Sequence, residues 1–514
     1  MKVGIFHKGL FMADPTAALR RLVWPSPAWG LVLAAALLSA CALTPLPPEA
    51  PPQAAPLRWH TPSAAGVNSQ SAASLPHQGS LDELLNWWRQ QGDPLLVELI
   101  VASQQVSPSV ASARARLAQA WAARVGAGAD LLPSVDAAAS LTRSRNLQDP
   151  AAPVSSVTTA RLGLQTAWEM DVFGSGRASR DAAAQRLLGA QADWHEARVS
   201  MAAEVAVQYD LLRQCRRLAL ISERDAASRA LTARLSERSR QAGMTAPALA
   251  GLARASAADA ASRVQQQRAQ CELETQALVA LTAWPEPELR QRLAGLPAAD
   301  ELTLPPLSLN PVPAQALAQR PDVYSAERAL QAARADIAST DAQRFPRVAL
   351  TGFVGGTALR AGQASPESAT WSLGPLSLTL PLLDGGRRAA QLTLAQARYE
   401  EAAAQYTARV RQAVREVESA LVNLQSTAER GPQVREAVSG YSAFLEGTQA
   451  RHRAGLASLL ELEEARRQML AAEISQAEWQ TQVRAAHVSL YRAVGGGWSP
   501  ALLAQTPAAL QAPQ

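Results

Sequence analysis

The residue types that most often carry out chemistry in proteins lack, in this sequence, the spacing of a catalytic or metal centre. The six histidines are scattered, and no cysteine–histidine pair has the intervals that bind zinc. The glycine run Gly495–Gly497 follows a predicted helix, whereas phosphate-binding loops follow a strand. Among 44 acidic residues chance carboxylate pairs are inevitable, so they do not predict a hydrolase. We therefore expect no enzyme, no cofactor and no metal.

Cys41 has the most specific predicted chemistry, because it directly follows a secretory signal. Two arginines precede the apolar run Leu31–Leu38, which is too short to span a bilayer as a mature helix. The segment resembles the lipobox of bacterial lipoproteins, in which cleavage leaves an acylated N-terminal cysteine; an ordinary cysteine after a signal is the alternative. Ala42 rather than aspartate follows it, which implies an outer-membrane destination. The proline-rich segment Pro45–Pro56 predicts an extended tether.

Cys215 and Cys271 would then lie in an oxidising compartment. Each is 28 residues from Gly243, which interrupts strong helical sequence and predicts a tight turn. Equal distances from a turn place both cysteines at the same height on the two arms of a helical hairpin. A disulfide there would close a loop of about 55 residues and stabilise the fold by roughly 4 kcal/mol. Two buried, unpaired thiols that only pack are the alternative.

Three landmarks occur twice, in the same order and about 210 residues apart, which indicates an internal duplication. They are the glycine turns, the prolines that precede strand-like segments, and the glycine–arginine pairs that precede long helical segments: Gly243 and Gly455, Pro133 and Pro346, Gly176-Arg177 and Gly386-Arg387. A duplication explains the length of the chain better than several unrelated domains.

Each copy alternates between helical and strand periodicity. It begins with a predicted helix, at Asp93–Ala127 and Pro313–Arg344. Apolar residues at every second position then predict two strands in each copy: Val135–Leu141 and Arg161–Val172, then Val348–Gly352 and Leu376–Leu382. Each copy therefore contains one β-hairpin.

Very long helices follow the hairpins. Apolar residues spaced by three and four, typical of a coiled coil, continue from Gly176 to Gly243 and from Gly386 to Gly455. Each segment has about 68 residues and predicts on the order of 100 Å of helix. A shorter helix follows each turn, so that two short helices placed end to end could flank each long one.

The four predicted strands cannot close a membrane barrel alone, because the smallest such barrels need about eight. An open sheet edge in lipid would leave backbone groups without partners. Strands that enter a membrane therefore require an oligomer, and three chains would supply twelve strands above a matching tube of helices. Small residues such as Ala182–Ala184 and Ala402–Ala404 would allow close helix packing in its wall.

The chain resembles the TolC-like outer-membrane factors, above all the lipid-anchored branch of resistance-nodulation-division (NodT-type) efflux systems. The matching motifs occur in the order Trp87-Trp88, Trp168–Gly174, Arg320–Val323, Arg453–Ser458 and Ser489–Trp498. The resemblance implies a mainly α fold with a small transmembrane β part: a homotrimeric twelve-stranded outer-membrane β-barrel, four strands per chain, continuous with a long periplasmic α-helical barrel.

The resemblance also implies roles for residues at the two glycine turns. Such turns dock against the periplasmic adaptor (membrane-fusion) protein, which makes Gly243, Gly455, Ala457 and Ser458 candidate contacts. Glu461 and Glu464 match the acidic residues that ring the closed aperture in TolC, and three chains would bring six carboxylates together. A solvated acidic face that includes Glu463 is the alternative. The first copy departs from the pattern, with Leu249 and Leu252 at the corresponding places.

The expected function is an exit duct of a tripartite efflux pump, with the adaptor and an inner-membrane transporter as partners and acylated Cys41 in outer-membrane lipid. A type I secretion duct, or a periplasmic coiled-coil scaffold lipoprotein, is the alternative. A net charge of +5 without a basic block does not predict nucleic-acid binding. The expected divisions are a signal peptide (1–40), anchor and tether (41–80), first repeat (81–283), equatorial linker (284–313), second repeat (314–494) and equatorial tail (495–514).

Overall fold

The structure is a computed structural model, and its described residues all lie between Pro47 and Trp498. It describes residues 47, 60, 87–145, 156–295, 317, 319–361 and 366–498. The predicted signal peptide and Cys41 therefore lie outside the described residues. So do most of the tether and most of the two predicted equatorial segments.

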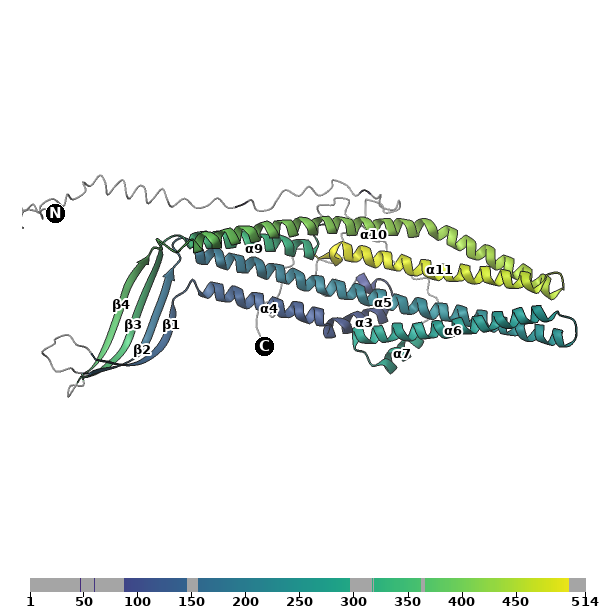
Figure 1. The fold of residues 1–514 in the computed structure, drawn as a ribbon, viewed down its shortest axis with the longest axis horizontal. Helices are drawn as coiled ribbons and strands as arrows, with labels where there is room; N and C mark the ends of the chain where they lie inside the picture. Colours follow the sequence, from purple (N-terminus) through teal and green to yellow (C-terminus); the bar gives the residue numbers. More distant parts are fainter. Residues whose placement is uncertain are drawn as a thin grey trace, which may run out of the picture. The chain divides into compact units, whose positions relative to one another are not determined.

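Each repeat contains an initial helical part, a β-hairpin, a long helix and a shorter helix, as predicted (Figure 1). The first repeat consists of α3 (Pro94–Val106), α4 (Pro108–Ala129), β1 (Ser134–Arg145), β2 (Ser156–Met170), α5 (Ser175–Gln241) and α6 (Pro247–Thr282). After α7 (Glu286–Ala294), the second repeat consists of α9 (Pro321–Ala342), β3 (Arg347–Ala361), β4 (Glu367–Thr379), α10 (Arg387–Arg453) and α11 (Leu459–Ala493), followed by the 3₁₀ turn η1 (Gly495–Gly497). The long helices α5 and α10 have 67 residues each.

The initial part of the first repeat differs from its prediction, because it is two helices rather than one. Ser107 separates α3 from α4 with extended backbone, and its hydroxyl accepts a hydrogen bond from the Val110 N–H at the start of α4. Pro108 occupies the first turn, where its missing N–H is tolerated, but it cannot continue the hydrogen bonds of α3. The Ser-Pro pair thus ends one helix and begins the next.

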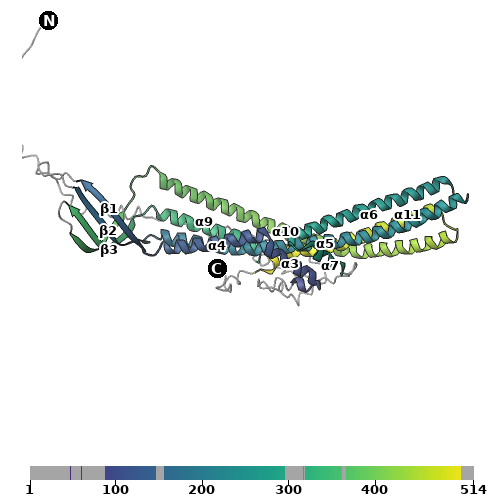
Figure 2. The ribbon, with the colours of Figure 1, turned by 90° about the horizontal axis from the view of Figure 1, so that it is seen from below.

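The shorter helices flank the long ones, as their lengths predicted. Helix α5 packs along α4, α6 and α9, and α10 packs along α9 and α11. The sheet lies at one end of the long helices, and the turns of the α5/α6 and α10/α11 hairpins lie at the other end (Figures 1 and 2). Contacts between α5 and α11 join the two repeats beyond the sheet.

Several residues of the recognised motifs meet in one hydrophobic core beside the middle of α5. The Trp87 ring stacks on that of Tyr491 with centroids 4.2 Å apart, and Trp88 is fully buried beside them. The Asp93 carboxylate accepts hydrogen bonds from the Tyr209 hydroxyl at 2.7 Å and from Arg213 at 2.8 Å. These contacts fix the start of α3 against α5 and the end of α11.

The four strands form one antiparallel sheet in the order β1-β2-β3-β4. The strands therefore pair in chain order, and the two hairpins join through β2 and β3. Strands β1 and β4 form the two edges, each pairing on one side only within the described chain. An edge of this kind presents backbone donors and acceptors to another chain.

Candidate functional site

The two faces of the sheet differ in polarity. One row across all four strands is apolar, and the next row, on the opposite face, is mostly polar. The apolar row is Ala137, Leu164, Val354 and Trp371; the mostly polar row is Asp136, Gln165, Phe353 and Ser372. The large residues of the apolar row are exposed, Leu164 at 50% and Trp371 at 77%, so none of the described residues covers this face. Such a sheet can separate lipid on one face from water on the other.

The turns at the far end of the helices have the same geometry in both repeats. Gly243 and Gly455 both have φ of +74°, a conformation that only glycine adopts without cost. The N–H of the residue after each glycine closes the turn, from Met244 to the Ser239 carbonyl and from Leu456 to the Arg451 carbonyl. The side chains of Met244 and Leu456 are 77% and 70% exposed. Sequence reasoning missed these two residues, although each follows a predicted turn glycine.

Replacing Gly455 with alanine should lower the free energy of unfolding by about 1–2 kcal/mol, because an L-residue is strained at positive φ. Gly447→Ala, inside α10, is the matched control and should raise it by up to about 1 kcal/mol. Neither added Cβ would meet another atom within 4 Å. Backbone conformation alone therefore decides whether each substitution raises or lowers the free energy of unfolding. Urea unfolding followed by circular dichroism measures both. Equal shifts in the same direction would contradict this account of the turn.

Ser458 and Glu461 form a capping box at the start of α11. The Glu461 carboxylate accepts from the Ser458 N–H at 2.6 Å, and the Ser458 hydroxyl accepts from the Glu461 N–H at 3.2 Å. The Ser458 N–H and the Ser458 hydroxyl both donate to this carboxylate, and these two bonds lower the pKa of Glu461, which stays charged near neutral pH. Glu464 pairs instead with Arg467, and the side chains of Glu461 and Glu464 are 51% and 44% exposed. Ala457 lies in the turn, where its carbonyl contacts His452.

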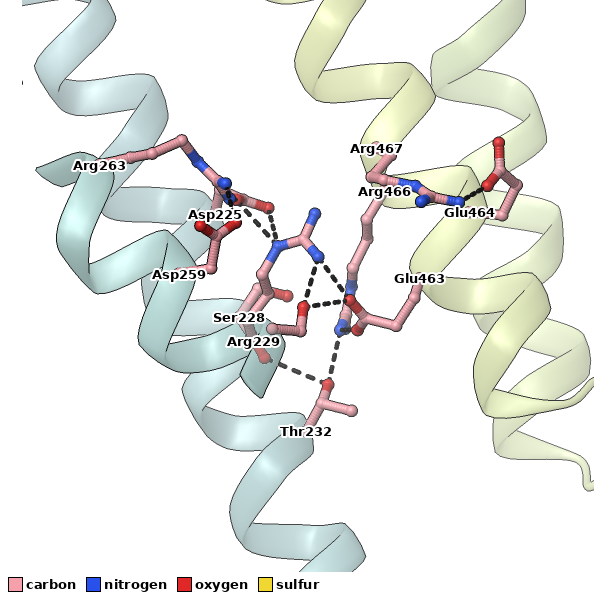
Figure 3. A network of polar contacts seen from close by, with 11 residues as sticks. Asp225, Ser228, Arg229, Thr232, Asp259, Arg263, Glu463, Glu464, Arg466 and Arg467 are labelled. Carbon is pink, nitrogen blue, oxygen red and sulfur yellow. Dashed lines mark hydrogen bonds and ion pairs between the residues drawn. The ribbon is translucent and has the colours of Figure 1, made fainter. Parts of the chain in front are cut away.

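Glu463, between these two residues, points toward Arg229 of α5 (Figure 3), and its side chain is buried rather than part of a solvated acidic face. Its carboxylate contacts Arg229 of α5 at 2.6 Å, Ser256 of α6 at 3.0 Å and Arg466 of its own helix at 2.9 Å. Arg229 also binds Asp225 at 2.9 Å, and both side chains are less than 10% exposed. The alternative of one solvated face is therefore wrong for Glu463. Its burial depends on a residue 234 positions away, which local spacing does not indicate.

Polar pairs continue between α5 and α11 toward the sheet. Asp210, Arg217 and Arg224 are spaced by seven residues and so lie on one face of a coiled helix. They contact residues of α11: Asp210 binds Arg484 at 2.7 Å, Arg217 binds Gln480, and Arg224 binds Glu473 at 3.1 Å. Hydrogen bonds and ion pairs thus join the two repeats between the core and the hairpin turns.

A disulfide joins Cys215 of α5 to Cys271 of α6, whose Cα atoms lie 5.5 Å apart. The two cysteines therefore occupy the same height on the two arms of the hairpin. The bond links the helices close to the hydrophobic core, three residues from buried Leu212 on α5 and seven residues from buried Leu278 on α6.

The described residues contain no group of three or more histidine, cysteine, aspartate or glutamate side chains placed to hold a metal ion. Within the same part of the chain, no helix has the length and hydropathy needed to cross a membrane.

A two-faced sheet with open edges, continuous with long helical hairpins, defines one protomer of an oligomeric membrane duct. The family follows from comparison with known proteins. Residues 99–283 and 312–496 each match the model of the outer membrane efflux protein family, and the chain belongs to this family. Both repeats match one model, in agreement with the predicted duplication.

Individual relatives extend over nearly the whole chain. Outer membrane protein OprJ of Pseudomonas aeruginosa is 30% identical over 92% of this chain and 96% of its own length. Solvent efflux pump outer membrane protein SrpC of Pseudomonas putida is 27% identical, covering 90% and 97%. Among solved structures, the outer-membrane channel OprN is 29% identical, with a TM-score of 0.72 over 87% of this chain and 99% of that chain. The Campylobacter jejuni CmeC channel shares the fold, with a TM-score of 0.78 over 90% and 96% of the two chains at 22% identity.

The chain is therefore an outer-membrane efflux channel with the trimeric fold of this family, and it extends from the outer membrane into the periplasm. The family consists of efflux ducts rather than enzymes. The predicted fold class and recognised family are confirmed.

Replacing Leu164 with arginine should prevent normal membrane insertion. Arginine on the lipid-facing side of a strand costs about 2–4 kcal/mol per chain near the bilayer midplane. Gln165→Arg, the next residue on β2, adds the same charge to the opposite, mostly polar face and should be tolerated. Western blots of heat-modifiable trimers in outer-membrane fractions provide the measurement. Equal loss of trimers in the two variants would contradict the assignment of the faces.

Proposed function

We propose that three copies of this chain form the exit duct of a tripartite efflux pump, conducting small molecules passively from periplasm to exterior. The polarity of the sheet carries this proposal, because twelve such strands would place apolar residues against lipid and Asp136, Arg161 and Gln165 around water. A periplasmic coiled-coil scaffold would not require a sheet with one apolar and one polar face. The relatives named for solvent efflux support small-molecule export.

The partners would be a periplasmic adaptor and an inner-membrane transporter. The adaptor would bind the helix turns, where Gly243, Gly455, Ala457 and Ser458 set the shape of the surface. Exposed Met244 and Leu456 add apolar side chains to it, which suits a helical partner. Acyl chains on Cys41 would hold the trimer in the outer membrane. The divisions at 284–313 and 495–514 stay predictions.

Glu461 and Glu464 would form the acidic gate of the duct. Both lie within two turns of the start of α11, next to the hairpin turn, and three chains would gather their carboxylates at the aperture. A ring of carboxylates attracts cations and repels anions. Arg467 contacts Glu464 and Arg451 lies 3.8 Å from Glu461, so an arginine would partly neutralise each carboxylate. The polar α5–α11 contacts would hold the aperture closed, since they can exchange with water more readily than an apolar seam.

Single-channel conductance in planar bilayers tests the duct and the gate together. The wild type should give small, cation-selective openings, and Glu461→Ala/Glu464→Ala should give larger and less selective ones. Glu478→Ala, which removes an exposed acid farther along α11, is the control and should match the wild type. Wild-type behaviour in the double variant would refute the gate but keep the duct. No conductance from a sample verified to be inserted would refute the duct.

A further inference from the structure

Three arginines lie on the apolar face of the sheet, at the end farthest from the helices. Arg143 of β1 and Arg360 of β3 are the paired neighbours of Thr158 on β2, one on each side. Arg145 pairs with Ser156 one step farther along the same face. Because neighbouring strands are about 4.8 Å apart, Arg143 and Arg360 are separated by about 10 Å across Thr158. Two arginines and a hydroxyl thus form one row.

The same face is continuous with the apolar row through Leu164. Thr158 is six residues from Leu164, Arg143 six from Ala137 and Arg360 six from Val354, and the even spacing keeps all of them on one side of the sheet. The β-bulge of this sheet lies between Leu350 and Gly352, outside this part, so it does not reverse the faces here. The arginines therefore point toward the same surroundings as the lipid-facing residues.

The distance along β2 places this row at the outer boundary of the membrane. Trp168, an aromatic residue of the same face, lies near the helical end of the strand, ten residues from Thr158. Ten residues rise about 34 Å, and a strand tilt of about 40° reduces that to roughly 25 Å of height. This height equals the apolar band of outer-membrane barrels, so Trp168 and Thr158 mark its two borders.

Charge on this border is mainly positive. Among the described strand residues of this face, Glu367 of β4, which pairs with Ala358, is the one carboxylate beside the three arginines. Within the described residues, none of the three arginines makes an ion pair; Arg143 donates one hydrogen bond, to the Ser156 hydroxyl at 3.4 Å. All three are exposed. The planar guanidinium group of an arginine can donate two parallel hydrogen bonds to the oxygens of one phosphate.

From this arrangement we infer that Arg143, Thr158 and Arg360 form a binding site for a phosphate group of an outer-leaflet glycolipid, with Arg145 beside it. The inference rests on the orientation of the sheet in the outer membrane, in which the hairpin tips face outward. Two arginines whose backbones are about 10 Å apart can converge with their side chains on one phosphate, while the acyl chains of the same lipid follow the apolar face below. A bound lipid would thereby fix the height of the duct in the membrane.

Native mass spectrometry of the intact, detergent-purified trimer tests this site by titration with lipid A and with dephosphorylated lipid A. The wild type should bind lipid A at least about tenfold more tightly than dephosphorylated lipid A, because the phosphate would make two charge-assisted contacts. Arg143→Gln/Arg360→Gln should lose this preference. Arg161→Gln removes one positive charge from the opposite face of β2. This control variant should keep the preference for phosphorylated lipid A. Inorganic phosphate at equal concentration should not compete, since it lacks the apolar part.

Arg143→Lys/Arg360→Lys keeps the charge without the planar fork and should bind with intermediate affinity. It tests the proposal even if the glutamine variant yields no trimers. Wild-type preference in the glutamine variant, or equal loss in Arg161→Gln, would overturn the site. Competition by free phosphate would assign the arginines to a soluble anion instead.

Discussion

Glu463→Ala is expected to lower the free energy of unfolding of the helical part by about 3–5 kcal/mol per chain. Removing one partner of a buried charge cluster leaves the others uncompensated, here Arg229 at 5% and Arg466 at 13% exposure. In conductance measurements the same variant should open more widely, because it releases α11 from α5 and α6 next to the turn. Thermal unfolding followed by circular dichroism measures the first effect.

Neighbouring Glu464 provides the control. Its pair with Arg467 is exposed, so Glu464→Ala should change the free energy of unfolding by no more than about 1 kcal/mol. Asp225→Asn/Arg229→Met/Glu463→Leu/Arg466→Met removes all four charges of the cluster together and should recover most of the stability lost in Glu463→Ala. If Glu463→Ala and Glu464→Ala are equally stable, the buried cluster does not hold the repeats together.

Cys215→Ser should lower the free energy of unfolding by about 4 kcal/mol, through the loss of a cross-link that closes 56 residues. Cys271→Ser should have the same effect, and the double variant should be no less stable than either single one. Reduction of the wild type should reproduce the loss and leave the serine variants unchanged. Denaturant unfolding with and without reductant provides the measurement. Stability independent of reductant would show that the thiols do not bond.

Elements defined by local periodicity could be predicted closely. The long helices begin and end within a few residues of the predicted glycines, because both the coiled-coil spacing and the terminating residue are in the local sequence. Strand positions followed from alternation only in part. All four strands extend closer to the hairpin tips than predicted, since serine, threonine and glycine weaken the pattern there, and β4 (Glu367–Thr379) begins nine residues before the predicted start and ends three residues before the predicted end. The break at Ser107 was missed, although a serine followed by proline is a common helix start.

The candidate gate could be predicted only in part. Glu461 and Glu464 are exposed next to the turn, as expected for aperture residues, but sequence alone does not show that Glu461 also caps its own helix. Glu463 was grouped with them because consecutive acids resemble a solvated face. Its burial arises where α5, α6 and α11 meet, which is a tertiary contact that periodicity within one helix does not encode.

The edges of the sheet have a genetic consequence. Because β1 and β4 each pair on one side only among the strands that the structure describes, every protomer would depend on two neighbours to complete its sheet. A damaged copy would therefore harm the intact chains that assemble with it. In a cell that makes equal amounts of normal and defective protein, only about one assembly in eight would contain three normal chains, given random closed threefold assembly. Mutations that spare trimer formation but block the duct should thus be dominant over the normal allele.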